Sequence, residues 1–356
     1  MFQYYTATIF IIIFAMFSLQ FCVARSNTLS HERKTLFRLL LVAVIIATFC
    51  EWFALFLEDH STLRVLTIIT KAVELSVAPS IGFLFAWVLE AKWVKAGIIY
   101  MLLHAAIECL SGVFGFIYYV DENNQYHHAQ FYNVYIMVYV ISMIFVIYII
   151  MHNIKKYQYS GRAFFLLIVV VMLSGIVIQL VNSELKTDYI AMGFTVALLY
   201  IFTLEMIQQT DELTSLLNRR GYENTLISMS KECVAIFFDV DGFKDVNDNY
   251  GHAFGDVVLK AIGNTIKEQY SRYGKCFRYG GDEFCVLLMK NRDNVEQINT
   301  SFFGAMAKLR EEEARMPAVS IGYACFDPKN QSMQDVVEEA DQMMYKFKEA
   351  HRTKII

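Results

Sequence analysis

The stretch Arg278-Tyr-Gly-Gly-Asp-Glu-Phe284 decides the fold of the C-terminal half, because it sets a tight turn between two apolar runs. The runs, at 275–279 and 284–289, predict two strands of an antiparallel hairpin. Gly280 and Gly281 have no Cβ, so a ligand can approach the backbone of the turn closely. The turn therefore predicts a binding site at the tip of a hairpin.

Carboxylates are expected to gather at this turn. Asp282 and Glu283 belong to it, and Asp239 ends the buried strand predicted at 234–238. If these strands are neighbours in one sheet, two or three carboxylates converge on one point. Oxygen-rich clusters of this kind suit Mg²⁺, which in such sites is usually shared with substrate phosphates.

Paired cations extend the pattern. Lys348 and Arg352 lie four residues apart on the last predicted helix, so both can address one anion. Carboxylates, a metal ion, glycines and paired cations together indicate a site for nucleotide phosphoryl transfer. The alternative for any single one of these features is a surface turn with solvated charges.

The remaining pattern of residues 208–356 predicts an α+β domain with a central, mostly antiparallel sheet flanked by helices. A fourth strand is expected at 318–325. Four helices are expected. The first follows Arg220 and ends at about 230, and the second follows a polar segment at 244–256 and ends at about 272. The other two lie at 293–314 and 334–350.

The two halves of the chain differ in charge. Of 31 Lys and Arg and 35 Asp and Glu, residues 1–207 hold 12 of each, so residues 208–356 hold 19 and 23. Charged residues make up 19% of the whole chain, against about 25% in soluble proteins, and apolar residues make up 56%. This composition excludes an ordinary soluble protein and a disordered one. Neither half has the excess of Lys and Arg that nucleic-acid binding needs.

Residues 1–207 predict a polytopic α-helical membrane domain in contact with the lipid bilayer. A helix needs about 20 apolar residues to cross a bilayer. Seven stretches meet this length, at 3–24, 36–57, 65–89, 94–118, 132–152, 163–182 and 188–207.

The orientation follows from the distribution of basic residues between the loops. The loops after spans one, three and five hold nine Lys and Arg, whereas the alternate loops hold only Arg64 and Lys186. This predicts an N-terminus outside and a C-terminal domain in the cytoplasm. The nine are Arg25, Arg33, Lys34, Arg38, Lys92, Lys95, Lys155, Lys156 and Arg162.

Ionisable side chains within the spans are functional candidates, because they are costly inside a bilayer. His104 and Glu108 lie four residues apart and so share one helical face. We expect a polar pocket, open to the outside, that binds an unknown small ligand or senses protons. The alternative is a network of hydrogen bonds and ion pairs that only holds the helices together. The candidates are Glu51, Lys71, Glu74, His104 and Glu108, with Gln179 and Asn182 at the same level.

Four ordered motifs in the C-terminal half resemble the GGDEF family, the diguanylate cyclases. They are Arg278–Phe284, the block Phe238-Asp-Val-Asp-Gly-Phe-Lys-Asp-Val-Asn-Asp248 with Gly251-His252 and Gly255-Asp256, the opening Asp211–Arg220, and Ala340-Asp341 through Tyr345. The resemblance covers the C-terminal half and none of the apolar half.

The resemblance implies that two GTP molecules are joined into cyclic di-GMP with release of two pyrophosphates, by a homodimer in which each domain holds one GTP. Asp239, the carbonyl of Val240, Asp282 and Glu283 would hold Mg²⁺, with Mn²⁺ as a substitute. Which carboxylate takes the proton stays open. Asn247 and Asp256 would read the guanine edge; Lys244, Lys348, Arg352 and the backbone from Phe238 to Phe243 would bind the phosphates.

Two departures from the family pattern carry predictions. The family's inhibitory RxxD places its Arg nine residues before the first Gly of the turn, but Ser271 and Gly274 stand at these positions. We therefore expect no product inhibition there. The terminal KxxGRN block keeps its two cations and loses Gly and Asn, so activity is expected to survive. The alternatives are a non-catalytic GTP-binding signalling sensor, and a receptor or transporter with an accessory cyclase domain.

Overall fold

The computed structural model describes residues 2–58, 60–89, 94–156, 162–182, 185–327 and 329–352. It separates into two compact units, which divide within the helix Asp188–Gln208, between Glu205 and Met206; Lys156 also groups with the second unit.

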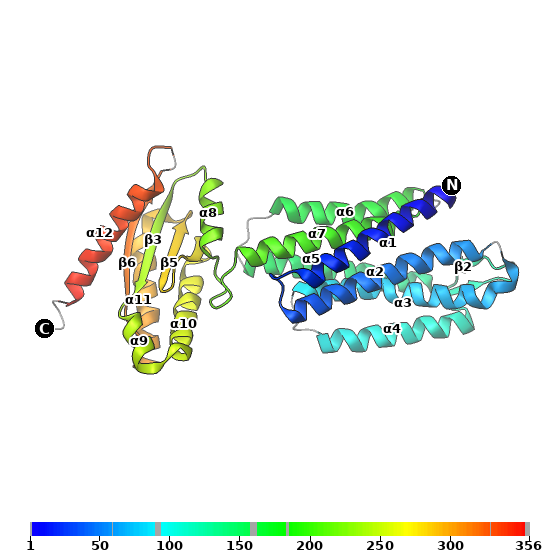
Figure 1. The fold of residues 1–356 in the computed structure, drawn as a ribbon, viewed down its shortest axis with the longest axis horizontal. Helices are drawn as coiled ribbons and strands as arrows, with labels where there is room; N and C mark the ends of the chain where they lie inside the picture. The colour runs from blue at the N-terminus through cyan, green and yellow to red at the C-terminus, as the bar shows by residue number, and fades with distance from the viewer. Residues whose placement is uncertain are drawn as a thin grey trace. The chain divides into compact units, whose positions relative to one another are not determined.

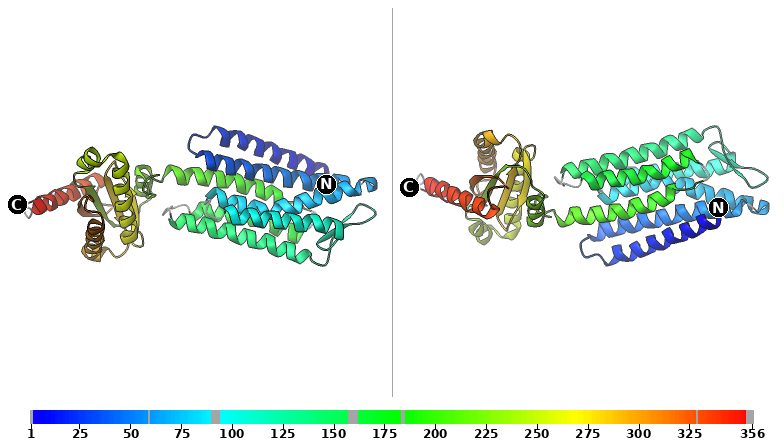
Figure 2. Two further views of the ribbon diagram at one scale, coloured as in Figure 1. Left: turned by 90° about the horizontal axis from the view of Figure 1, so that it is seen from below. Right: turned by 90° about the horizontal axis from the view of Figure 1, so that it is seen from above.

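The N-terminal unit is a bundle of long helices that run side by side (Figures 1 and 2). Six of them are long and apolar enough to cross a membrane, whereas α6 has a shorter apolar run, Ala163–Gln179, so a seventh span is not confirmed. The helices are α1 (Phe2–Arg25), α2 (His31–Leu57), α3 (Arg64–Leu89), α4 (Val94–Phe114), α5 (Tyr132–Lys156), α6 (Arg162–Val181) and α7 (Asp188–Gln208).

The loop between α4 and α5 folds into a small hairpin that the sequence did not predict. Strand β1 (Tyr118–Val120) pairs antiparallel with β2 (Tyr126–His128). Helix α4 ends four residues before the predicted end of its span, because Gly115 adopts φ +71°, which is outside the helical region. Arg64 Nε and Nη2 donate to the Val120 carbonyl at 2.9 and 2.7 Å, which ties the hairpin to the start of α3.

The C-terminal unit contains the predicted antiparallel sheet. Its strand order is β4-β5-β3-β6, and every neighbouring pair is antiparallel. Because the hairpin strand β5 lies beside β3, the end of β3 and the hairpin turn meet at one edge of the sheet. The strands are β3 (Cys233–Val240), β4 (Gly274–Arg278), β5 (Glu283–Leu288) and β6 (Val319–Phe326).

Helices cover both faces of this sheet. Val234, Ile236 and Phe238 of β3 join the core formed with α10 (His252–Tyr270) and α11 (Val295–Glu312). The alternate residues of β3 face the opposite core, formed with α8 (Arg219–Ile227) and α12 (Met333–Arg352). This two-sided burial explains why β3 is a continuous apolar run and not an alternating one.

The polar segment at 244–256 differs from its prediction. It forms the short helix α9 (Phe243–Tyr250) and the first turns of α10. Only Val246 of α9 is buried, so the segment carries little apolar signal, although it is helical.

Candidate active site

The predicted carboxylates lie at the edge where β3 and β5 end. Asp239 of β3 is the direct cross-strand partner of Glu283 of β5. Directly opposed residues of an antiparallel pair have Cβ atoms roughly 4.5–5.5 Å apart, so the two side chains lie close together on one face of the sheet. Asp282 precedes Glu283 on the turn, and Val240 follows Asp239 on β3. The structure thus brings together the residues proposed to hold a metal ion.

Mutual repulsion marks this group of carboxylates. The pKa of Glu283 is raised by partial burial and by the negative charges of Asp282, Asp239 and Asp341. The pKa of Asp341 is raised by burial and by Asp239. Asp341, on α12, is therefore a fourth member that the analysis of single residues missed. The signal was present, because Ala340-Asp341 belongs to the terminal motif.

The donor chemistry fits a hard divalent cation. Carboxylate oxygens are the ligands that Mg²⁺ prefers, and a cation would relieve the repulsion between these groups. Within the described ranges, no three His, Cys, Asp or Glu side chains already stand close enough to hold a metal ion. The carboxylates would therefore have to close around the ion as it binds.

The two glycines shape the turn in different ways. Tyr279 N–H and Gly280 N–H both donate to the Glu283 carbonyl, at 2.8 and 3.2 Å, which closes the turn. A Cβ on Gly280 would lie 2.5 Å from Glu283 Oε2, whereas a Cβ on Gly281 would meet nothing within 4 Å. Gly280 therefore makes room for the Glu283 side chain, and Gly281 leaves space for a ligand.

Arg278 clamps the turn to the start of the domain. Its Nε and Nη2 donate to the Gly281 carbonyl at 3.1 and 2.7 Å. Its Nη1 pairs with the Asp211 carboxylate at 3.2 Å, and Asp211 Oδ1 also accepts from Thr214 N–H and Oγ1–H at 2.8 and 2.7 Å. The side chains of Arg278 and Asp211 are only 15% and 22% exposed. The clamp thus joins the turn to a residue three positions beyond α7.

The predicted nucleotide-binding residues lie on α9 and α10. The side chain of Asn247 rests against Gly255, where a Cβ would approach Asn247 Oδ1 to 2.0 Å. Asp256 follows Gly255 and is exposed, as is Lys244. Phe243 is half-buried against the core at the first turn of α9. The side chains of Lys348 and Arg352 lie outside the described residues.

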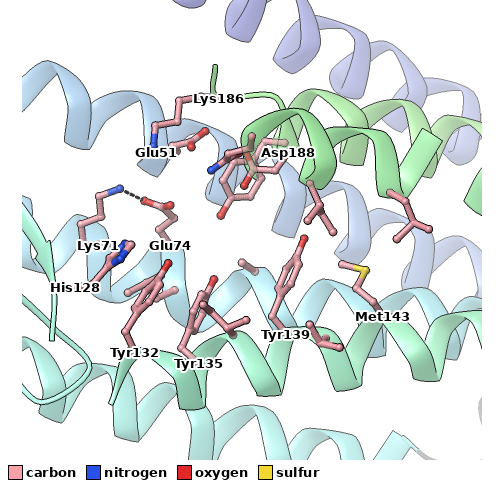
Figure 3. A pocket seen from close by; sticks show the side chains of 18 of the residues that line it. Glu51, Lys71, Glu74, His128, Tyr132, Tyr135, Tyr139, Met143, Lys186 and Asp188 are labelled. Atoms are coloured by element: carbon pink, nitrogen blue, oxygen red, sulfur yellow. Dashed lines mark hydrogen bonds and ion pairs between the residues drawn. The ribbon is translucent and has the colours of Figure 1, made fainter. Parts of the chain in front are cut away.

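The ionisable residues of the N-terminal unit fall into two groups. Glu51, Lys71 and Glu74 line a cavity of about 590 Å³, together with Gln179 (Figure 3). His104 and Glu108 are not among its lining residues. The helical spacing that tied His104 to Glu108 thus did not identify the cavity.

The His104 and Glu108 pair is packed between helices. His104 Nε2 lies 3.1 Å from the Leu75 carbonyl of α3 and 3.8 Å from Glu108 Oε1. Because a carbonyl only accepts, the contact with Leu75 requires the Nε2–H tautomer. This arrangement matches the structural alternative, in which polar side chains join helices.

Comparison with known proteins identifies the C-terminal unit. Residues 208–354 match the family described as diguanylate cyclase, GGDEF domain. The chain is 34% identical over 157 residues to diguanylate cyclase DgcN of Escherichia coli (strain K12), covering 41% of this chain and 38% of that protein. It is 32% identical over 161 residues to an uncharacterized membrane protein of Staphylococcus aureus (strain USA300), covering 41% and 45%.

A solved structure also resembles this unit. The GGDEF domain of DgcB from Caulobacter crescentus, in complex with c-di-GMP, is 25% identical with a TM-score of 0.35, covering 40% of this chain and 89% of that one. The chain spans less than half the length of the two curated relatives. Residues 208–354 thus contain a GGDEF domain.

Proposed function

We propose that the protein is a membrane-bound diguanylate cyclase, which condenses two GTP molecules into cyclic di-GMP and two pyrophosphates. The observation that carries the proposal is the pairing of Asp239 with Glu283, beside Asp282 and the open space at Gly281. A phosphate can reach the backbone at this turn, beside the carboxylates. The family match of residues 208–354 supports the same chemistry.

The reaction exchanges a phosphoanhydride bond of each GTP for a phosphodiester bond. The 3′-oxygen of each GTP forms a bond to the α-phosphorus of the other, the bond from that phosphorus to the bridging oxygen breaks, and pyrophosphate leaves. The 3′-hydroxyl proton passes to a carboxylate or to water. Mg²⁺, when bound, would stabilise the charge that develops on the phosphate oxygens. Asp239, the Val240 carbonyl, Asp282 and Glu283 would hold it.

Substrate recognition is assigned to the two helices beside the carboxylates. Asn247, which rests against Gly255, and the exposed Asp256 can hydrogen-bond the guanine edge. Lys244 is exposed at the start of α9, where the backbone N–H groups of the first turn can bind an anion. With Lys348 and Arg352 these groups would neutralise the β- and γ-phosphates.

Regulation is assigned to the membrane unit of a homodimer. One domain holds one GTP, so two domains must face each other. Helix α7 ends at Gln208, and Asn218 holds this point through Nδ2–H to the Gln208 carbonyl and N–H to the Gln209 carbonyl, both at 2.9 Å. Residues 208–210 are thus fastened to the GGDEF domain, so movement of α7 would move the domain.

The location and topology follow from the distribution of basic residues. Seven spans with the N-terminus outside would place the GGDEF domain in the cytoplasm, where GTP is available. The nine basic residues on one side against two on the other support this orientation in a bacterial inner membrane.

Product analysis tests the proposal. The full-length protein in nanodiscs receives GTP and Mg²⁺, and the products are identified by mass spectrometry. We expect cyclic di-GMP from the native protein and from Glu311→Ala, which removes an exposed carboxylate of α11, and none from Asp282→Ala. GTP binding without product, in every buffer and with every membrane ligand tested, would instead support the non-catalytic sensor.

A further inference from the structure

The membrane cavity has aromatic walls. Tyr132, Tyr135 and Tyr139 lie at spacings of three and four on α5, and Figure 3 shows their rings pointing from one helical face toward the acidic residues. Tyr189 of α7, with Tyr126 and His128 of β2, completes the aromatic lining. A volume of about 590 Å³ suits a small organic molecule, since such sites usually measure about 300–1,000 Å³.

The charges in the cavity leave an excess of one carboxylate. Lys71 Nζ is 2.8 Å from Glu74 Oε2, so this pair neutralises itself, and Nζ also lies 4.8 Å from the centre of the Tyr126 ring. The other charged lining residues are Glu51, which accepts a hydrogen bond from Tyr5, with Asp188 and Lys186. By formal charge, three carboxylates thus face two lysines. His128 also lines the cavity, but burial and the nearby Lys186 and Lys71 lower its pKa, so it adds no positive charge near neutral pH and the lining favours a cation over an anion.

Two buried acceptor atoms in the lining lack a donor. Asp188 Oδ1 and Gln179 Oε1 have no hydrogen-bond partner among the residues that the structure describes. A buried acceptor without a donor costs free energy, because it has lost water and gained nothing in return. A ligand with N–H groups would satisfy both atoms.

We infer that this cavity binds a small protonated amine carried on an apolar or aromatic body. Its N–H groups would donate to Asp188 and Gln179, and tyrosine rings attract cations through their faces. Its body would lie against Leu75, Met143 and Ile176, which are among the apolar lining residues. The ethanolamine headgroup of a lipid and a free amine share this chemistry.

The cavity lies at the beginning of the helix that leads to the GGDEF domain. Asp188 and Tyr189 form the first turn of α7, whose last residue is Gln208. A ligand held by Asp188 therefore acts on the helix that ends three residues before Asp211, the partner of Arg278. The expectation that binding changes the cyclase rate rests on the proposed function, whereas the binding site does not.

Calorimetric titration of the full-length protein in phosphatidylglycerol nanodiscs tests the binding site. The probes are 2-phenylethylamine and 3-phenylpropanoate, which share a body and differ in the charge of the head group. We expect the amine to bind and the carboxylate not to bind. Binding of the carboxylate as tightly as the amine, or binding of neither, would overturn the inference.

Variants locate the binding. Asp188→Asn should weaken amine binding by about 10- to 100-fold, and Gln179→Met by about 3- to 10-fold, as expected for charged and neutral hydrogen bonds. The control is Glu122→Gln, which removes an exposed carboxylate of the β1–β2 turn and should leave binding unchanged. Gel filtration checks folding, and Gln179→Met decides if Asp188→Asn does not fold. Equal affinity in all folded variants would refute the assignment.

Two further measurements distinguish a lipid headgroup from a free amine as the ligand, and test the binding site separately from the cyclase activity. If a lipid headgroup is the natural ligand, phosphatidylethanolamine in the nanodisc should compete with 2-phenylethylamine; a free amine predicts unchanged binding. Cyclic di-GMP formation is measured with and without 2-phenylethylamine. Intact binding without any product overturns the proposed cyclase and leaves the site standing, whereas product formation without amine binding overturns only the site.

Discussion

The two units of this chain gather carboxylates in opposite ways. At the hairpin turn, burial and the negative charges of Asp282, Asp239 and Asp341 raise the pKa of Glu283, and burial together with Asp239 raises the pKa of Asp341. In the membrane cavity, Glu74 is matched by Lys71 at 2.8 Å. The first arrangement suits a divalent cation that arrives with a substrate. The second arrangement contains two lysines against three carboxylates, so one additional positive charge would neutralise it.

The largest effect, comparable to that of Asp282→Ala, is expected from removing the carboxylate of β3 that pairs with the turn. Asp239→Ala should lower the rate of cyclic di-GMP formation by about 10²–10³-fold, because a preorganised group that stabilises charge in the transition state is lost. Mass spectrometry of the product measures this, with Glu311→Ala as the control. A rate within threefold of native, as a rough limit set by ordinary surface substitutions, would contradict the assignment.

A smaller effect is expected from opening the clamp on the turn. Arg278→Gln should slow the reaction by about tenfold, because the Gly281 carbonyl loses its donors and the turn is less well positioned. Chemical denaturation of the C-terminal unit should show that the free energy of unfolding falls by about 1.5–3 kcal/mol, as for the loss of other hydrogen bonds to charged groups.

The clamp predicts coupling between its two ends. Asp211→Asn should lower the free energy of unfolding by a similar amount, and the double variant should lose less than the sum of the two single losses, because the ion pair between the two side chains is counted in both. Fully additive losses would show that Arg278 and Asp211 act independently.

A smaller effect, of a few-fold in the rate of cyclic di-GMP formation with 2-phenylethylamine, is expected from interrupting α7 where the two units divide. A Gly-Ser-Gly-Ser insert between Glu205 and Met206 should keep basal cyclic di-GMP formation and abolish its response to 2-phenylethylamine. An insert of seven alanines, about two helical turns, should keep the response, because it preserves the phase of the helix. A response that survives the flexible insert would show that α7 does not transmit it.

A slight effect is expected on stability from the repulsion at the turn. A raised carboxyl pKa means that the folded unit binds the proton more tightly than the unfolded chain, so this group favours folding at acidic pH and opposes it as pH rises through the raised value. Glu283→Gln should therefore raise Tm by about 1–2 °C near neutral pH, a small gain because Glu283 is exposed.

Thermal unfolding of residues 206–356 in metal-free buffer, followed by circular dichroism, measures this difference. The difference in Tm between Glu283→Gln and the native protein should disappear below about pH 4, where the native glutamate is itself protonated. A difference that grows as the pH falls would mean that the ionised carboxylate stabilises the fold.

The fold of the C-terminal unit could be predicted well, because the strands of this unit are continuous apolar runs and two of them are joined by a glycine turn. The hairpin and the fourth strand lie within one or two residues of their predicted positions. Helix α9 was missed because only Val246 is buried on it. Asp341 belongs to the terminal motif, but it was missed as a member of the carboxylate group because its nearness to Asp239 depends on how α12 packs.

The membrane cavity could not be predicted in detail for a related reason. Helix positions follow from hydropathy, but the faces that meet depend on the shapes of many side chains. Glu51, Glu74 and Asp188 come from three different helices, and tyrosines in an apolar run are indistinguishable by sequence from lipid-facing ones. His104 and Glu108, linked by spacing, lie elsewhere.

No effect at all is expected from added product. Ser271 and Gly274 replace the inhibitory pair, and a Cβ on Gly274 would lie 2.1 Å from the Leu287 carbonyl, so this strand position has no room for a side chain. Initial rates measured with increasing cyclic di-GMP should stay constant. A rate that falls in a saturable way would reveal an inhibitory site elsewhere on the chain.

The stoichiometry of the products tests the proposed reaction most directly. Pyrophosphate and cyclic di-GMP are quantified in the same reaction of full-length protein with GTP and Mg²⁺. Because each of two bonds formed expels one pyrophosphate, we predict two pyrophosphates for every cyclic di-GMP, with both lost in Asp282→Ala. Release of inorganic phosphate and GDP without cyclic di-GMP would show GTP hydrolysis instead, and would contradict the proposed function.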